Sequence, residues 1–430
     1  MTRPFAAPDP FCRGCDADAE SGKLVSVETA LRRGLELAGP VAGAERLPLG
    51  KAHWRMLAEA VRAERSLPLF DNSAMDGYAI RISDLAGSGP WRLPVSGRVA
   101  AGDAGSEPVP AGAALRIFTG APVPPGCDAV IIQEMTRPAG NMVWLDQRPE
   151  PGENIRHAGE DLVAGAQIMP AGKRIGPRAA ALLASTGCGE VIVRRRVRVA
   201  FFSTGSELCA PGTPLAPGQI WNSNRYHLQG SLAQPWVETI DMRAVPDRPD
   251  RPDRLRGALE LAFRAADLVV TTGGVSVGDE DHMPAVLCVA GGTVHVMKVA
   301  LKPGKPLIIG QIGRALYIGL PGNPVSAFVT WNVLGARIAE ALAGLADAAP
   351  PRILVLAGFD RLRRPERCDS LPVRLGGCDE HGARVAQIAT TEVSHRVALL
   401  AQADGLLLIP SETSRIQCCD MPEFLPFPNA

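Results

Sequence analysis

The sequence has no excess of charge of either sign, since Lys and Arg together number 45 and Asp and Glu together also number 45. Proteins that bind nucleic acid or an acidic membrane surface normally carry a basic excess. The composition therefore argues against both kinds of partner.

Long apolar runs are missing as well. No segment approaches the roughly 18 apolar residues that a membrane-spanning helix needs, and residues 1–15 contain no apolar stretch typical of a secretory signal. We therefore expect a cytoplasmic protein that does not enter a membrane.

Clustered cysteines are scarce. The ten cysteines are scattered, apart from Cys12-x-x-Cys15 and the adjacent Cys418 and Cys419. In a cytosolic protein such residues remain reduced thiols. Cys12 and Cys15 could form half of a metal site, but their proline-rich surroundings favour a flexible tail with free thiols.

The first half of the chain changes texture twice. Apolar residues recur at helical spacing after a candidate N-cap at Ser26, His53 to Ala63 continues the pattern, and Arg178 to Ser185 is helical again. Between them, short apolar runs alternate with Gly and Pro clusters, which is typical of strands. This pattern predicts a split helical domain, residues 21–66 and 155–194, with a β domain, residues 67–154, inserted into it.

The second half alternates strands, glycine turns and helices. The strands are predicted at Arg198 to Phe202, Asp267 to Val270 and Ala315 to Gly319, and a helix at Val325 to Gly344. Such alternation indicates a doubly wound α/β domain, residues 195–347, with a largely parallel sheet. Short strands return in residues 350–430 and predict a C-terminal β domain.

Ligands of a parallel α/β sheet collect at the carboxyl ends of its strands. Three such ends carry glycines and hydroxyls: Ser203-Thr-Gly-Ser-Glu207, Thr272-Gly-Gly-Val-Ser276 and Leu320-Pro-Gly-Asn-Pro324. Glycine lets the backbone approach a ligand, and helix N-termini favour phosphate. No turn matches a P-loop or a dinucleotide motif. The turns therefore indicate a phosphorylated small molecule, although each alone could be purely structural.

A lysine-rich segment, Met297-Lys-Val-Ala-Leu-Lys-Pro-Gly-Lys-Pro306, lies close to these turns in the sequence. On one strand Lys298 and Lys302 would share a face, and the Pro303-Gly304 turn would bring Lys305 back toward them. Three ammonium groups could then hold an oxyanion. The alternative is a solvated edge strand whose lysines prevent aggregation.

Several carboxylates stand at glycine-flanked turns, where they could hold Mg²⁺. They are Asp71, Asp76, Glu160, Asp161, Glu207, Asp279 and Asp281. Mg²⁺ takes oxygen ligands from one or two carboxylates and from substrate phosphates. Any single one of these acids could equally be a solvated turn residue, so only their convergence in the fold would make a site.

A series of motifs, in one order along the chain, resembles the molybdopterin molybdenumtransferases, the molybdenum insertase family that includes the gephyrin E domain. The motifs are Asp71-Asn-Ser-Ala-Met-Asp-Gly-Tyr-Ala79, Phe118-Thr-Gly-Ala-Pro122, Asn154-Ile-Arg156 with Gly159-Glu-Asp161, Ser203-Thr-Gly-Ser-Glu-Leu208, Asn222-Ser-Asn224, Gly273-Gly-Val-Ser-Val-Gly278, Lys302-Pro-Gly-Lys-Pro306 and Leu320-Pro-Gly-Asn-Pro-Val-Ser326. Motifs this long and this numerous are highly specific.

The resemblance implies a four-part elongated subunit that forms a homodimer, with a C-terminal β-barrel-like domain. It implies a transferase that takes adenylyl-molybdopterin and molybdate, uses Mg²⁺, and releases AMP with the completed cofactor. Each active site would lie between the β insertion of one subunit and the α/β domain of the other. Transient contact with other cofactor-biosynthesis proteins is also expected.

The resemblance also implies residue roles. The catalytic set is Asp76, Thr119, Asp161, Glu207 and Asp281, with Glu207 and Asp281 as metal ligands. The substrate-binding set is Gly273, Gly274, Ser276, Lys298, Lys302, Lys305, Pro321 and Pro324. No nucleophile with a Ser-His or Cys-His arrangement is needed.

Two other functions remain open from the sequence. One is a pterin-binding adenylyltransferase-like enzyme, which would share the α/β domain but lack the β insertion. The other is a non-catalytic scaffold in the manner of gephyrin. The motif from Asp71 to Tyr78 favours the insertase over the first, and the absence of gephyrin's additional domain argues against the second.

Overall fold

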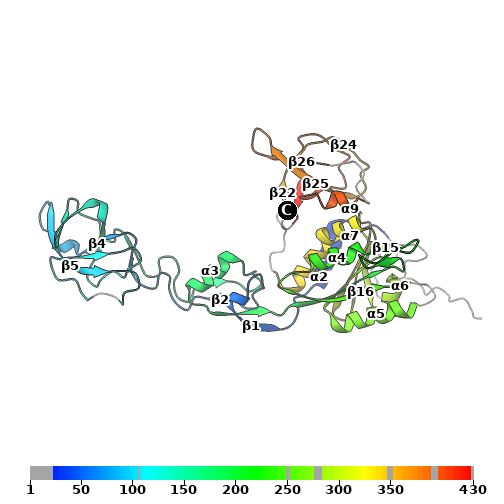
Figure 1. Ribbon diagram of the computed structural model, residues 1–430, viewed down its shortest axis with the longest axis horizontal. Helices are drawn as coiled ribbons and strands as arrows, with labels where there is room; N and C mark the ends of the chain where they lie inside the picture. Colours follow the sequence, from blue (N-terminus) through cyan, green and yellow to red (C-terminus); the bar gives the residue numbers. More distant parts are fainter. Residues whose placement is uncertain are drawn as a thin grey trace, which may run out of the picture.

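The structure is a computed structural model that describes residues 23–104, 107–247, 252–275, 283–345, 352–388 and 396–427. The described chain forms an elongated molecule, with the β insertion at one end and the α/β and C-terminal domains at the other (Figure 1). Cys12, Cys15, Ser276, Asp279 and Asp281 lie outside the described residues.

A six-stranded mixed sheet forms the α/β domain, with the strand order β16-β13-β17-β21-β20-β18. Strands β16, β13, β17 and β21 are parallel. At the edge next to β21, strand β20 runs antiparallel to β21 and strand β18 runs antiparallel to β20. The strands are β13 (Val197–Thr204), β16 (Val237–Val245), β17 (Leu268–Thr272), β18 (Thr293–Lys298), β20 (Pro306–Ile312) and β21 (Ala315–Leu320). The short strands β14 (Leu208–Cys209) and β15 (Ile220–Trp221) pair beside it.

Alternate residues of the central strands enter two separate cores. Val199 and Phe201 of β13 pack into one core, while Ala200 and Phe202 pack into the other. Buried parallel strands are apolar on both faces for this reason. The first core is covered by α2 (Val27–Leu37), α4 (Ser223–Ser231), α7 (Pro324–Thr330), a π-helical turn (Trp331–Gly335) and α8 (Ala336–Leu342), and the second by α5 (Pro252–Ala265) and α6 (Met283–Val289).

Helix α2 begins as expected but packs elsewhere than expected. The Ser26 hydroxyl accepts a hydrogen bond from the Thr29 N–H, which caps the helix. Buried residues of α2 belong to the same core as the α/β sheet, and Gly34 lies directly against Ile338 of α8. Because the apolar stripe of α2 is buried there, this helix is part of the α/β body and not of the split domain predicted for residues 21–66.

The split domain is less helical than predicted. Residues His53 to Ala63 form no helix, because Met56 and Leu57 are buried in two different cores and make isolated bridges to Arg174 and Val193. Its two segments pair with each other across the insertion. The paired strands are β1 (Ala44–Pro48) with β12 (Glu190–Arg194) and β2 (Val61–Arg62) with β11 (Gln167–Met169). The domain also has a 3-10 turn (Leu49–Lys51) and the helix α3 (Pro177–Ser185), which was predicted at Arg178 to Ser185.

The inserted domain is a six-stranded sheet with the order β7-β4-β6-β5-β9-β8 and a core on each face. Strands β3 and β10 pair where the chain enters and leaves it. The strands are β3 (Asn72–Ser73), β4 (Gly77–Ile80), β5 (Trp91–Val99), β6 (Ala114–Ile117), β7 (Ala129–Ile132), β8 (Thr136–Ala139), β9 (Met142–Leu145) and β10 (Ile155–Arg156), with 3-10 turns at Ile82–Asp84 and Gln133–Met135.

The C-terminal domain is a curled sheet with its own core, joined to the α/β domain. Leu406, Leu408 and Leu425 enter the core of the α/β domain, which joins the two bodies. Its elements are β22 (Ile353–Leu354), β23 (Leu356–Ala357), β24 (Arg361–Leu362), β25 (Cys368–Cys378), β26 (Arg384–Gln387), α9 (Val397–Leu400), β27 (Gly405–Ile409), β28 (Arg415–Ile416) and β29 (Glu423–Pro426). Strand β19 (Leu301–Lys302) pairs with β25.

The half-buried imidazole of His227 on α4 lies near the junction of these two domains, and both of its ring nitrogens are buried. Its ring packs 4.8 Å from that of Phe328, which contacts Phe427 edge-on at 4.9 Å. Neither ring nitrogen has a hydrogen-bond partner in the described part of the chain, and burial lowers the pKa of His227 to about 4. The folded protein therefore holds a neutral imidazole here.

Replacing His227 with Leu is expected to weaken the acid sensitivity of the fold. Between pH 6.5 and 4 the unfolded chain binds a proton that the native imidazole cannot, so stability falls as the pH is lowered through this window. At about 1.4 kcal/mol per pKa unit, the cost reaches up to about 3 kcal/mol. Urea unfolding at pH 7.5 and pH 5 should show a smaller difference for His227→Leu than for wild type. An equal difference, or the same reduction in the exposed-site control His53→Leu, would contradict this account.

Candidate active site

Three parallel strands of the α/β sheet end side by side. Strand β13 pairs with β17, and β17 pairs with β21, with Ser203 opposite Thr272 and Thr272 opposite Leu320. The turns that follow these strands are therefore neighbours at one rim of the sheet. The sequence predicted this rim from glycine turns alone.

Gly273 fills the narrow space between the other two turns. Its φ is +91°, and a Cβ atom there would lie 2.6 Å from the carbonyl oxygen of Thr204. Its N–H donates to the Leu320 carbonyl at 3.0 Å. Only glycine suits this combination of backbone conformation and close approach.

A chain of buried side-chain hydrogen bonds runs beneath the rim. The Thr272 hydroxyl donates to the Ser203 hydroxyl at 2.9 Å, and the latter donates to Asn222 Oδ1 at 3.1 Å. The same oxygen accepts the Arg225 N–H and caps α4. The packed strands therefore determine where α4 begins.

Two amide atoms at this end of α4 are left unpaired. Asn224 Nδ2 donates to the Gly322 carbonyl at 2.8 Å, which ties α4 to the third turn. Asn222 Nδ2 and Asn224 Oδ1 are buried without a hydrogen-bond partner in the described part of the chain. Buried polar groups are normally satisfied, so the partners of this donor and this acceptor lie outside the described protein atoms.

Glu207 is exposed beside the first turn. A Cβ atom on Gly205 would lie 2.7 Å from both of its carboxylate oxygens, so the carboxylate lies directly over that glycine. The Ser206 N–H and hydroxyl both donate to Asp247 Oδ1, at 2.9 and 3.1 Å. Of the predicted rim residues, Gly274, Pro321 and Pro324 also lie in these turns.

The lysine segment is not the single strand that was predicted. Lys298 ends β18, and Lys302 ends β19, which pairs with β25 of the C-terminal domain through the Lys302 and Asp369 positions. The Lys305 carbonyl accepts a hydrogen bond from the Val299 N–H at 2.9 Å, which closes the loop from Val299 to Lys305. The argument from strand alternation therefore fails for Lys298 and Lys302, although Lys302 and Lys305 are both exposed.

At the other end of the molecule, Asp76 and Thr119 form one unit. The Thr119 N–H and hydroxyl both donate to Asp76 Oδ1 at 2.8 Å. These bonds, the backbone one first, lower the pKa of Asp76. They use only Oδ1, and Oδ2 makes no hydrogen bond or ion pair with another described residue. Two predicted residues 43 positions apart in the sequence thus meet in the fold.

Asp161 is not part of this unit. It is exposed at the base of the insertion, where its N–H donates to the Leu67 carbonyl at 3.0 Å. It lines a cavity of about 380 Å³ with Leu67, Pro68, Arg156 and Glu160. Within the described residues it shares no hydrogen bond or ion pair with Asp76 or Thr119.

The predicted residues therefore form two groups in one chain. The Asp76–Thr119 unit belongs to the inserted domain near β4, whereas Glu207 and the glycine turns belong to the α/β domain at the opposite end of the molecule (Figure 1). A single subunit of this shape does not bring the two groups together.

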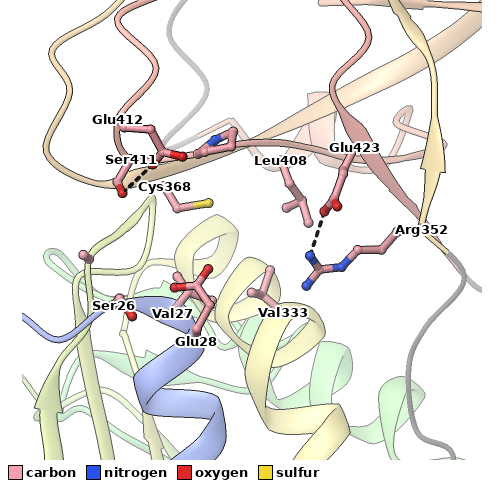
Figure 2. Close-up of a pocket in the computed structure, with 12 residues that line it drawn as sticks. Ser26, Val27, Glu28, Val333, Arg352, Cys368, Leu408, Ser411, Glu412 and Glu423 are labelled. Atoms are coloured by element: carbon pink, nitrogen blue, oxygen red, sulfur yellow. Dashed lines mark hydrogen bonds and ion pairs between the residues drawn. The ribbon is translucent and has the colours of Figure 1, made fainter.

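A further cleft separates α2 from the C-terminal domain (Figure 2). It has a volume of about 410 Å³, and an ion pair of 2.7 Å between Arg352 and Glu423 lies on one side. Burial raises the pKa of the Cys368 thiol in its wall to about 11. None of the residues predicted from the sequence to form the site lines this cleft.

Sequence reasoning missed Arg116, whose guanidinium contacts both the Tyr78 and Phe118 rings at 5.0 Å beside Asp76 and Thr119. Arg116 lies in one of the short apolar runs predicted for residues 67–154 and just before the motif that begins at Phe118. Its available signal was a cation and an aromatic residue at alternating positions, which lie on one face of a strand.

Comparison with known proteins places the chain. Residues 25–187 match the model described as "MoeA N-terminal region (domain I and II)", and residues 200–340 match "Probable molybdopterin binding domain". The molybdopterin molybdenumtransferase of Haemophilus influenzae is 35% identical over 94% of this chain and 99% of its own length, and that of Nostoc sp. is 38% identical over 74% of each chain.

The fold comparison agrees. The crystal structure of a molybdopterin biosynthesis moeA protein from Pyrococcus horikoshii matches with a TM-score of 0.80 and 26% identity, over 94% of this chain and all of that one. No helix in the described residues is long and apolar enough to span a bilayer. The match extends through the β insertion, which an adenylyltransferase-like enzyme would lack. This chain therefore belongs to the molybdopterin molybdenumtransferase family.

Proposed function

We propose that this protein inserts molybdenum from molybdate into adenylyl-molybdopterin and releases AMP with the completed molybdenum cofactor. The names of its relatives support this activity. The observation that carries the proposal is the rim of the α/β sheet, where three glycine turns meet above the unpaired Asn222 Nδ2 and Asn224 Oδ1. An unpaired donor and acceptor beside close-packed backbone suit a polar pterin that carries a phosphate.

The chemistry would rest on positioning and charge neutralisation. Molybdate is a dianion and the pyrophosphate of the substrate is also anionic, so their approach must be offset by fixed cations. Lys298, Lys302 and Lys305 are the proposed cations, and Ser276 with the turn from Pro321 to Pro324 forms the proposed pterin and oxyanion rim. Asp76 and Thr119 from the inserted domain, and Asp161 from its base, would face the adenylate. Displacing adenylate in a well-positioned complex needs no protein nucleophile.

Mg²⁺ is part of the proposal. Among the described residues no group of three or more His, Cys, Asp or Glu side chains could hold a metal ion. The described rim carries the exposed carboxylate of Glu207, and Mg²⁺ commonly takes only one or two carboxylates plus substrate phosphate oxygens. Glu207 and Asp281 would hold the ion, which would neutralise charge on the pyrophosphate.

A homodimer is also proposed, because one chain keeps its two groups of site residues at opposite ends (Figure 1). The inserted domain of one subunit would complete the rim of the other, as a two-fold dimer allows twice over. The proposal includes a cytosolic location, where free thiols such as the described cysteines stay reduced. Contact with other cofactor-biosynthesis proteins would be transient.

The decisive experiment is AMP release by the purified protein incubated with adenylyl-molybdopterin, Mg²⁺ and molybdate. AMP should form in proportion to completed cofactor, and omission of molybdate should reduce both. If adenylyl-molybdopterin binds but no AMP forms under any of these conditions, the scaffold function is favoured. If the protein instead forms adenylyl-molybdopterin from molybdopterin and ATP, the adenylyltransferase function is favoured.

Replacing Lys302 or Lys305 with Ala is expected to raise the molybdate concentration needed for half-maximal AMP release. Both lysines are exposed, Lys302 at the end of β19 and Lys305 just before β20. A charge-assisted hydrogen bond to an oxyanion is worth about 1.5–3 kcal/mol. The expected shift is about tenfold to a hundredfold. Loss of Lys298 should act on the pterin phosphate instead. Titration of molybdate at saturating adenylyl-molybdopterin measures each effect.

The control for the lysines is Lys51→Ala, which removes an exposed lysine in the split domain. It should leave the molybdate response unchanged. If Lys302→Ala and Lys305→Ala also leave it unchanged, these lysines are solvated edge residues and do not hold the oxyanion.

A further inference from the structure

We propose that Arg116 is the positioning residue of the Asp76–Thr119 unit, holding the three backbone segments that carry it in one arrangement. Arg116 lies on β6, opposite Tyr78 of β4 on one side and Arg98 of β5 on the other. Residues in register on neighbouring strands present their side chains on one face. The Arg116 side chain therefore crosses the sheet surface next to the unit. Its consequence for turnover rests on the proposed function, while its structural consequence does not.

One guanidinium reaches every segment that determines the position of Asp76 and Thr119. Its Nη1 donates to the carbonyl of Gly77, the residue after Asp76, at 3.3 Å. Its carbon lies 5.0 Å from the ring of Phe118, the residue before Thr119. Its Nη2 donates to Gln133 Oε1, and the Gln133 N–H donates to the Asp76 carbonyl at 3.0 Å.

The planar shape of arginine is what this arrangement uses. The guanidinium donates in two directions and also packs against two aromatic rings, those of Tyr78 and Phe118, each at 5.0 Å. A lysine ammonium carries the same charge but lacks the rigid fork and the flat faces. Arg116→Lys therefore keeps the charge and removes the geometry.

The chain provides a matched control in Arg98. Its guanidinium lies 5.2 Å from the same Phe118 ring. In the described part of the chain it makes no hydrogen bond or ion pair with Gly77, Gln133, Asp76 or Thr119. Arg98→Lys thus makes the same chemical change on the same face and alters a contact with Phe118, but it leaves the hydrogen bonds of Arg116 to Gly77 and Gln133 in place.

The first readout is the Thr119 amide in protein labelled with ¹⁵N-threonine, with its signal assigned by its loss in Thr119→Val. In the wild-type protein the hydrogen bond to Asp76 should change the chemical shift of this amide and slow its hydrogen exchange with water. Arg116→Lys and Arg116→Ala should speed its exchange by about tenfold or more, as loss of about 1.4 kcal/mol of local stability would. Arg98→Lys should leave it unchanged.

The second readout is AMP release. Arg116→Lys should lower kcat by about tenfold to a hundredfold, because a misplacement of about 1 Å can cost a hundredfold. The KM for adenylyl-molybdopterin should change little. One result would overturn the proposal: the KM is raised in Arg116→Ala and returns to the wild-type value in Arg116→Lys, while the exchange rate of the Thr119 amide stays unchanged. Arg116 would then be a direct ligand of the anionic substrate. If wild type releases no AMP, the proposed function fails, and the amide alone still decides the role of Arg116. If Arg116→Ala does not fold, Arg116→Lys gives the answer.

Discussion

Asp76→Asn is expected to lower AMP release by about a hundredfold or more while leaving the fold intact. The asparagine Oδ1 can still accept both hydrogen bonds from Thr119. In the wild-type structure these two donors lie 2.8 Å from Asp76 Oδ1. The substitution removes the negative charge and turns the free Oδ2 acceptor into an NH₂ donor. Loss of one preorganised polar contact at a reacting group typically costs about a hundredfold to a thousandfold in rate. Steady-state AMP release and thermal unfolding measured side by side test this.

The control is Asp146→Asn, which removes a carboxylate paired with Arg137 on the surface of the same domain. It should be nearly silent, since exposed ion pairs contribute little. If Asp76→Asn lowers the unfolding temperature strongly and the loss of AMP release is explained by the loss of folded protein, Asp76 is a structural turn residue and has no part in the reaction.

The same variant tests the shared site. Subunits that carry Asp76→Asn, refolded with an equal amount of subunits that carry Lys302→Ala, should regain about a quarter of the wild-type sites, because half of the random dimers hold one intact site of two. The measurement belongs at a molybdate concentration where each parent alone is nearly inactive. A strictly monomeric protein with full turnover would contradict the shared site.

Gly273→Ala is expected to have the largest effect on stability, lowering the free energy of unfolding by about 3 kcal/mol. The backbone φ of +91° is strained for alanine, and its Cβ would lie 2.6 Å from the Thr204 carbonyl oxygen and 2.7 Å from its hydroxyl oxygen. Such backbone strain costs about 1–3 kcal/mol, and the clash with a buried strand end adds to it. AMP release should fall further than the loss of stability alone explains, because the turn at Gly273 would move away from the two neighbouring turns of the rim.

Gly212→Ala separates the two causes. Gly212 has a φ of +86°, but nothing lies within 4 Å of an added Cβ atom. This variant should lose only about 1–2 kcal/mol, the cost of a left-handed residue with a side chain, and should keep its activity. Equal losses in the two variants, measured by urea unfolding, would show that the contact with Thr204 contributes nothing.

The sequence predicted local structure well where neighbouring residues decide it. The Ser26 cap requires only a hydroxyl within reach of the Thr29 N–H, and helix α3 and the strand at residues 198–202 are determined by their own apolar spacing. Glycine turns after buried strands likewise predicted the rim, because parallel strands of one sheet must end at the same edge. The motifs that resemble the family identified it, as the matches to known proteins confirmed.

Tertiary structure decided what depends on distant partners. His53 to Ala63 has helical spacing, yet it forms turns and isolated bridges because Met56 and Leu57 are buried in separate cores. Lys302 was placed on one strand with Lys298, but it pairs with the C-terminal domain, 67 positions away at Asp369. The Asp76–Thr119 unit, the role of Arg116 and the separation of the two site groups follow from strand register and domain placement. Local patterns record short-range preferences of the backbone, whereas these contacts depend on which surfaces of the whole chain can be buried together.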